Sequence, residues 1–206
     1  MTNHVHVYQK GQDENGITFV LLHGTGGNER DLLPIAQMID PSANVLGVRG
    51  NVLENGMPRF FRRLAEGVFD KEDLKNRTDE LDQFLKEAAK EYGFNGDKMV
   101  AIGYSNGANI AANLLYEHGS VLNGAMLFHA MVPQEKSALP ALNETAVFVG
   151  AGKQDQMIPA QETETLVADL KQAGATVEAF WTDGGHQLVR EEIDAAKQWY
   201  ESKVNI

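Results

Sequence analysis

The feature that most constrains the fold of this chain is a regular alternation of short apolar runs with longer helical patterns. The apolar runs are hydrophobic at nearly every position, which is typical of strands buried on both faces. In chain order they are ITFVLLHG, NVLGV, KMVAIG, GAMLFH and TAVFVGAG, and TVEAFWT is a further strand. Helical patterns such as NGANIAANLLYEHG and QETETLVADLKQAG lie between them. This order predicts an α/β fold, with a mainly parallel central sheet and helices on both faces.

Length, composition and charge fit one soluble domain that spans residues 1–206. No linker, repeat or low-complexity stretch divides the chain. The formal net charge of −11 argues against nucleic acid or an anionic membrane surface as a partner. The N-terminal segment lacks a basic region followed by an apolar run, and no apolar run approaches the ~18 residues that span a bilayer. We therefore expect a cytoplasmic protein, for which a homodimer is a possible assembly.

Residues 49–72 have no clear period and predict a long surface loop with at most one helical turn. Because long loops in compact domains are often functional, we expect Phe60 and Phe61 to wall the site. The helix that follows has apolar residues at helical spacing, with Thr78 as its expected N-cap and Gly93 as its end. No insertion is long enough to form a large lid.

The motif GYSNG, residues 103–107, lies between a predicted strand and a predicted helix. In open parallel sheets, ligands bind beyond the carboxyl ends of the strands, where this motif falls. A strand that turns at once into a helix strains its central residue, and side chains at positions 103 and 107 would collide with neighbouring elements. Glycine removes these collisions and lifts Ser105 above the sheet. The five residues alone also fit a plain glycine turn.

A serine nucleophile needs a base, and an imidazole base works best when a carboxylate fixes its tautomer. Asp155 follows one predicted strand and His186 follows the next, in the order Ser, Asp, His that this topology requires. Taken singly, Asp155 could be a turn former and His186 a surface histidine. Their joint order and placement favour a catalytic triad.

His129 is the rival base, since it also follows a predicted strand at the same edge. It precedes Asp155 in the chain, so we assign His129 to the wall of the substrate pocket. Ile158, in the segment that carries Asp155, is assigned to the same pocket. The developing oxyanion needs two backbone donors, for which we expect the amides of Asn106 and Thr25. The HGTGG segment that contains Thr25 also fits a plain glycine loop.

Cofactor and metal motifs are incomplete. GTGGNE lacks the third glycine of a dinucleotide-binding loop, and GAGKQ departs from a phosphate loop at two positions. The chain has no HExxH motif and no cysteine, which also removes thiolate ligands and cysteine nucleophiles. We expect no metal and no cofactor.

Five ordered segments resemble the α/β-hydrolases of the phospholipase/carboxylesterase group, which includes acyl-protein thioesterases and small bacterial carboxylesterases. They are LHGTGGNERDLLP, VRGN, GYSNGANIA, GAGKQDQMIP and DGGHQL. GYSNGANIA, MPRFFRRL and LFHAMVP are most similar to small bacterial hydrolases associated with resistance to hydroquinones and quinones. The resemblance covers nearly the whole chain. Many relatives carry Gln at position 106 and Ser-Gly at positions 129–130, so substrate preference does not transfer.

The resemblance implies that Ser105 is the nucleophile, that Asp155 and His186 activate it, and that Thr25 and Asn106 bind the oxyanion. Cysteine-based dienelactone hydrolases share the fold, but the absence of cysteine excludes their mechanism. The expected function is hydrolysis of small carboxylic esters or thioesters through an acyl-enzyme. A small amidase or peptidase, and a binding module that keeps the pocket without turnover, remain alternatives.

Overall fold

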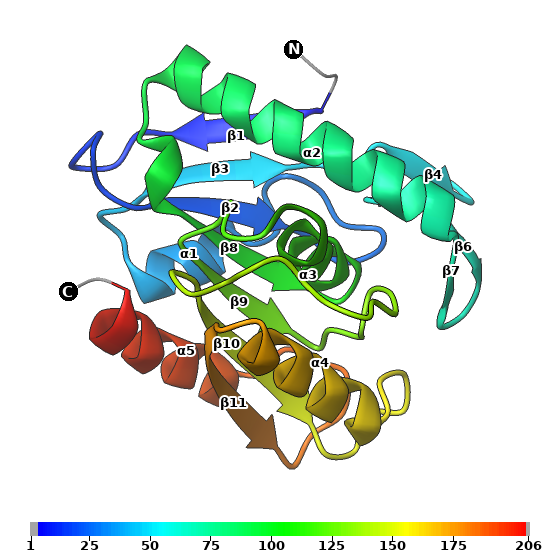
Figure 1. The fold of residues 1–206 in the computed structure, drawn as a ribbon. Coiled ribbons are helices and arrows are strands. Elements are labelled where there is room, and N and C mark those ends of the chain that lie inside the picture. Colours follow the sequence, from blue (N-terminus) through cyan, green and yellow to red (C-terminus); the bar gives the residue numbers. More distant parts are fainter. Residues whose placement is uncertain (1–3, 205–206) are drawn as a thin grey trace.

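The computed structural model describes residues 4–204 and contains a seven-stranded central sheet (Figure 1). The spatial order is β1-β3-β2-β8-β9-β10-β11, and all neighbours are parallel except the pair β1 and β3. The strands are β1 His6–Gln9, β2 Thr18–Leu22, β3 Asn44–Val48, β8 Met99–Tyr104, β9 Gly124–Phe128, β10 Ala146–Gly152 and β11 Thr176–Thr182. The predicted α/β class with a mainly parallel sheet is confirmed.

Helices cover both faces of the sheet, as predicted. One face carries α2 (Lys71–Tyr92), α3 (Asn106–His118) and α4 (Ala160–Gln172). The other face carries α1 (Leu33–Ile39) and α5 (Arg190–Lys203), which contact each other (Figure 1). A short 3₁₀ helix, Gly96–Lys98, precedes β8. Within residues 4–204, no helix is both long and apolar enough to cross a membrane.

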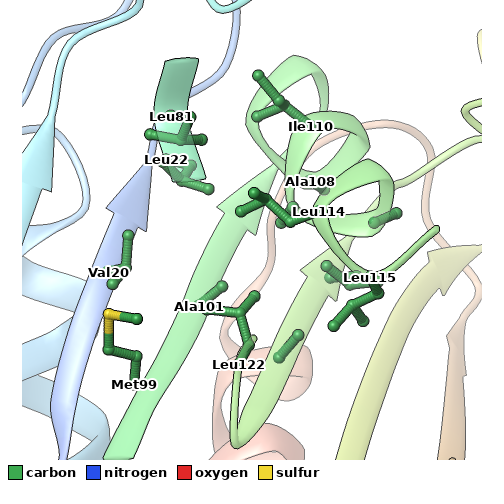
Figure 2. Close-up of a cluster of buried hydrophobic side chains, with 14 of the residues drawn as sticks. Val20, Leu22, Leu81, Met99, Ala101, Ala108, Ile110, Leu114, Leu115 and Leu122 are labelled. Atoms are coloured by element: carbon green, nitrogen blue, oxygen red, sulfur yellow. The ribbon is translucent and has the colours of Figure 1, made fainter. Parts of the chain in front are cut away.

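Side chains of the central strands alternate between two separate cores. Val20 and Leu22 of β2 belong to the cluster beneath α2, α3 and α4, and Figure 2 shows Leu22 near Leu81 and Val20 near Met99. Phe19 and Leu21 of the same strand pack into the cluster beneath α1 and α5. Because each face of the strand meets a helix layer, apolar residues are favoured at nearly every position of the run. This explains why the central strands read as unbroken hydrophobic runs in the sequence.

Two β-hairpins replace the loop that we predicted for residues 49–72. The first pairs β4 (Val52–Glu54) with β5 (Met57–Arg59), and the second pairs β6 (Arg63–Ala65) with β7 (Val68–Phe69). Both lie beyond the carboxyl ends of the parallel strands (Figure 1). The first turns at Asn55 and Gly56, whose φ angles of 52° and 79° suit a two-residue hairpin turn. The prediction of an irregular loop is therefore wrong for residues 52–69, which form these hairpins without a helical turn.

The helix α2 begins earlier than its apolar pattern predicted. Asp70 is the N-cap, and its side chain accepts a hydrogen bond from the Asp73 N–H. Thr78, the predicted N-cap, is buried in the middle of the helix and donates its hydroxyl to the Leu74 carbonyl. The prediction failed because the first two turns are mostly polar and show no apolar face. The predicted end at Gly93 is confirmed, with a left-handed φ of 74°.

Candidate active site

Ser105 occupies a strained turn between β8 and α3, with φ 52° and ψ −114°. Non-glycine residues rarely adopt such a conformation, and it persists only where the surroundings enforce it. A Cβ atom at Gly107 would overlap the carbonyl oxygen of Leu22 in β2, and one at Gly103 would lie 2.7 Å from the Ala108 Cα. The collisions that we expected at both glycines are therefore present. They explain why the motif has glycine on both sides of the serine.

Ser105, His186 and Asp155 come together at the carboxyl edge of the sheet. Ser105 Oγ lies 2.9 Å from His186 Nε2, and His186 Nδ1 lies 2.8 Å from Asp155 Oδ2. Both contacts are satisfied by one tautomer, in which Nδ1–H donates to the carboxylate and Nε2 accepts the serine proton. A serine nucleophile and its base require this arrangement.

Asp155 is held on both oxygens. Its Oδ1 accepts hydrogen bonds from the N–H groups of Met157 and Ile158, each at 2.9 Å, and its Oδ2 contacts both His186 and His129. Burial alone would raise the pKa of this carboxyl, but these hydrogen bonds outweigh burial and lower the pKa below its ordinary value. Asp155 is therefore ionised at neutral pH and fixed in orientation.

His129 lies beneath the triad and does not wall the pocket, which corrects our prediction. Its side chain is fully buried, and its Nδ1 is 3.0 Å from Asp155 Oδ2. Its backbone has φ 56°, and its N–H donates to the Gly150 carbonyl at 2.8 Å. The imidazole is directed away from the cavity, toward α5. A histidine after a strand can point to either side of the sheet edge, and the sequence alone does not say which.

Glu192, the partner of His129, was missed by the sequence analysis. It is a fully buried carboxylate in the first turn of α5, and His129 Nε2 lies 3.0 and 3.1 Å from its two oxygens. Burial opposes protonation of His129, but its contacts with Glu192 and Asp155 raise its pKa above the ordinary value. One signal could have found this residue, because Glu192 shares a helix face with Ala196 and Trp199, both buried.

Within residues 4–204, one group of three side chains has the residue types and spacing that could hold a metal ion. It consists of His129, Asp155 and His186. Their candidate ligand atoms lie within 4.8 Å of one another. The Nδ1 atoms of both histidines are already directed at Asp155 Oδ2. Hydrogen bonds among the three side chains therefore account for their close approach.

The two residues expected to supply the oxyanion donors, Thr25 and Asn106, line the same cavity as Ser105. Asn106 begins α3, so its amide has no acceptor within the helix and lies at the positive end of the helix dipole. Thr25 follows β2 in a turn where Gly27 N–H donates to the Gly24 carbonyl at 3.0 Å. The neighbouring Gly26 N–H donates to the Pro58 carbonyl at 2.9 Å. Gly26 is thereby engaged with the first hairpin.

A cavity of about 320 Å³ opens above the serine and is lined by Ser105, His186, Thr25 and Asn106. Ile158 is part of the lining, where we expected it. The remaining wall includes Arg59, Phe69, Tyr104, Met131 and Met157. The two hairpins and the segments after β8, β9 and β10 thus supply most of the wall.

Phe60 and Phe61 are absent from this lining, which corrects a second prediction. Their side chains are 1% and 0% exposed and belong to the core beneath α2 and α3. Their backbone does serve the site, because Phe60 N–H donates to Asn106 Oδ1 at 2.8 Å. The Phe61 carbonyl accepts a hydrogen bond from Arg59 Nε at 3.2 Å. The segment was therefore correctly placed beside the site, but the rings face the opposite way.

The mainly parallel sheet, the strained serine turn and the absence of a large lid among residues 4–204 define an α/β-hydrolase. The chain belongs to the dienelactone hydrolase family, whose profile matches residues 50–202. Since the chain has no cysteine, a thiolate nucleophile is not available to it.

Named relatives agree with this assignment. The chain is 52% identical over 199 residues to MhqD of Bacillus subtilis (strain 168), which is assigned as a hydrolase, and the match covers 97% of this chain and 98% of MhqD. It is similar to the crystal structure of the Bacillus cereus carboxylesterase, with 55% identity, a TM-score of 0.95 and coverage of 96% and 93%. YahD, solved with malic acid, has 33% identity, a TM-score of 0.92 and coverage of 97% and 98%. The predicted resemblance to small bacterial carboxylesterases is confirmed, and the protein is a carboxylesterase-type hydrolase.

Proposed function

We propose that this protein hydrolyses small carboxylic esters or thioesters through a covalent acyl-enzyme, with Ser105, His186 and Asp155 as its triad. The observation that carries the proposal is the continuous contact from Ser105 Oγ through His186 to Asp155, at 2.9 and 2.8 Å. The strained turn that presents Ser105 supports the same assignment. A plain glycine turn would require neither the base nor its carboxylate.

The reaction follows from the geometry. His186 Nε2 accepts the Ser105 proton while Oγ attacks the substrate carbonyl carbon, which creates a tetrahedral oxyanion. Collapse of this intermediate breaks the bond to the leaving group, which takes the proton from His186. Water then loses a proton to His186 and attacks the acyl-enzyme, and Ser105 leaves with that proton. Asp155 stays ionised throughout and stabilises the imidazolium.

His129 and Glu192 act as positioning residues in this scheme. Neither side chain reaches the cavity, so neither contacts the substrate. Together with the amides of Met157 and Ile158, His129 occupies the acceptor positions of Asp155 that His186 leaves open. This restrains rotation of the carboxylate and hence the aim of the catalytic base.

The cavity volume of about 320 Å³ is at the small end for ligand pockets and supports a small substrate. The relative YahD, solved with malic acid, supports a ligand of similar size and chemistry. We therefore place short esters of carboxylic acids first among the candidate substrates.

Labelling with a fluorophosphonate tests the nucleophile, since the probe forms a covalent bond with an activated serine. We expect one label per chain, carried by the peptide that contains Ser105, and no label in Ser105→Ala. Ser137→Ala is the matched control, because Ser137 is exposed on a loop. Undiminished labelling and ester hydrolysis in Ser105→Ala would refute the assignment.

The oxyanion donors are tested at Thr25, where the working group is a backbone amide. Thr25→Pro removes the N–H and should lower kcat on a neutral ester by about 10²–10³-fold. Thr25→Ala keeps the N–H and should be much milder, although it loses the hydrogen bond from Arg59. Thermal stability serves as the control for distortion of the loop. Equal and small effects of both substitutions would place the second donor elsewhere.

A further inference from the structure

Arg59 is a buried cation that forms no ion pair in the described part of the chain. It ends the first hairpin, is 3% exposed and lines the cavity above Ser105. Its guanidinium donates to the Phe61 carbonyl at 3.2 Å and to the Thr25 hydroxyl at 2.6 Å, and both acceptors are neutral. Within residues 4–204, no carboxylate oxygen lies within 4.0 Å of its nitrogens.

The other arginines of this segment are paired. Arg63 forms a two-point contact with Glu54 at 2.8 Å, and Arg62 pairs with Asp70. Glu54 is therefore already committed to Arg63 and attracts Arg59 only from beyond ion-pair distance, so Arg59 has no direct ion pair. Burial lowers the pKa of Arg59, and the positive charge of Arg63 acts in the same direction. An arginine nevertheless stays protonated in proteins, so the cavity contains a fixed positive charge.

A second residue that lines the same cavity, Asn106, has a side-chain donor without an acceptor in the described part of the chain. Asn106 is 2% exposed and lines the same cavity, and its Oδ1 is fixed by the hydrogen bond from Phe60 N–H. That bond assigns the other terminal atom as Nδ2, which is buried without a partner in the described chain. Buried polar groups are normally hydrogen-bonded, and buried charges are normally paired. Two exceptions in one cavity indicate that a ligand supplies the acceptors.

We propose that Arg59 and the Asn106 side chain form an anion subsite of the cavity, so that the preferred substrates are small esters that carry a carboxylate. The inference rests on the proposed hydrolase function and names the substrate class of that site. A guanidinium and a carboxylate make short, charge-assisted hydrogen bonds, and the amide of Asn106 adds one more donor. The subsite is local, since the whole chain has a formal net charge of −11 and repels anions at long range.

A bracing role for Arg59 is the competing explanation, because its bond to Thr25 steadies the oxyanion loop. That role requires only one hydrogen bond, which a neutral side chain could provide without a buried charge. It also leaves Asn106 Nδ2 unexplained. The two roles differ in what they predict, because bracing affects all esters alike, whereas an anion subsite affects charged esters selectively.

Two matched substrate pairs separate these roles. Monoethyl succinate and ethyl levulinate differ only by a carboxylate or a methyl ketone on the acyl side. O-acetylglycolate and acetoxyacetone make the same comparison on the alcohol side. We expect the wild-type enzyme to favour the charged member of at least one pair by about 10–100-fold in kcat/KM, the range for hydrogen bonds to charged groups.

Substitution of Arg59 tests the source of the preference. Arg59→Met should abolish the preference while the neutral member of the pair is still hydrolysed, and Arg59→Lys should retain part of it. Arg62→Met removes an exposed charge from the same segment and should leave the preference intact. A preference that survives in Arg59→Met, or equal losses on charged and neutral esters, would overturn the inference.

A measurement on the wild-type protein covers the case in which Arg59→Met does not fold. Succinate should inhibit hydrolysis of a neutral ester with an inhibition constant about ten-fold or more below that of succinamide, its neutral diamide. Equal inhibition by both compounds would overturn the anion subsite, with the hydrolase function itself intact. Failure of the proposed function has a different signature, namely neutral-ester hydrolysis that does not depend on Ser105.

Discussion

Asp155 contacts two histidines, His186 on the side of the cavity and His129 on the side of the core, and the surroundings of these two rings differ. On the cavity side, His186 has a side chain that is 18% exposed, contacts Ser105 and lies on a loop after β11. On the core side, His129 is fully buried and contacts Glu192 on α5. Both rings direct Nδ1 at the same oxygen of Asp155, at 2.8 and 3.0 Å.

This comparison teaches that contact with the carboxylate does not by itself make a catalytic base. A base must also reach the nucleophile and gain and lose a proton within each turnover. His186 contacts Ser105 at 2.9 Å, and we propose that it also exchanges the proton, whereas His129 is enclosed by two carboxylates that favour its protonated form. In the proposed mechanism, the same residue type therefore serves proton transfer on one side of Asp155 and orientation on the other.

The largest expected effect is on activity. His186→Ala should lower kcat by about 10⁴-fold or more, as does Ser105→Ala, because triad members act as a unit. His129→Asn should cost far less, because its side-chain amide can still donate to Asp155. Steady-state rates on one neutral ester measure both. A larger loss of kcat in His129→Asn than in His186→Ala would identify His129 as the base and contradict the assignment of His186.

The next largest effect is on stability. Here we expect the larger loss from substitution of His129 and the smaller loss from substitution of His186. His129→Ala removes the cationic partner of the buried Glu192, which keeps only the hydrogen bond from the Val189 N–H, and such a change typically costs about 3–5 kcal/mol. His186→Ala removes a partly exposed ring and should cost much less. Urea unfolding of both variants gives the free energies. Equal losses of unfolding free energy in the two variants would show that His129 does not contribute more to stability than His186.

The smallest effect is a pH dependence specific to the core side. The pKa of His129 is raised above its ordinary value of 6.5, so its stabilising contribution is complete below that pH. The contribution is lost as the pH rises through the folded-state pKa. Glu192→Gln removes the negative partner, so the wild type should exceed this variant by about 1 kcal/mol or more near pH 6 and by less near pH 9.

Unfolding free energies at both pH values check this prediction. Glu191→Gln is the matched control, since it is the neighbouring exposed carboxylate in the same helical turn. A wild-type advantage that grew with pH would contradict the protonated state of His129.

Much of the fold was predictable because the central strands are buried on both faces. Runs such as ITFVLLHG have one interpretation once helices alternate with them. The order of Ser105, Asp155 and His186 was predictable for the same reason, since each follows a recognisable strand. The glycines at positions 103 and 107 indicated that no side chain fits on either side of Ser105, and the structure confirms this.

The hairpins and the wall of the cavity were not predictable to the same degree. Strands of two or three residues are too short to show alternation, although Asn55-Gly56 was a usable turn signal. Phe60 and Phe61 gave no indication of which side their rings face. The pairing of His129 with Glu192 joins β9 to α5 across 63 residues of sequence, and such a contact has no local pattern.

The hairpin segment, residues 52–69, has a consequence for how proteins of this kind diversify. Its backbone is tied to the hydrolase body at a few points, such as Gly26 N–H to Pro58 O and Phe60 N–H to Asn106 Oδ1. Insertions or deletions at its two turns would reshape the mouth of the cavity and leave the sheet register unchanged. Changes at these turns can therefore alter substrate selectivity while Ser105, Asp155 and His186 keep their positions.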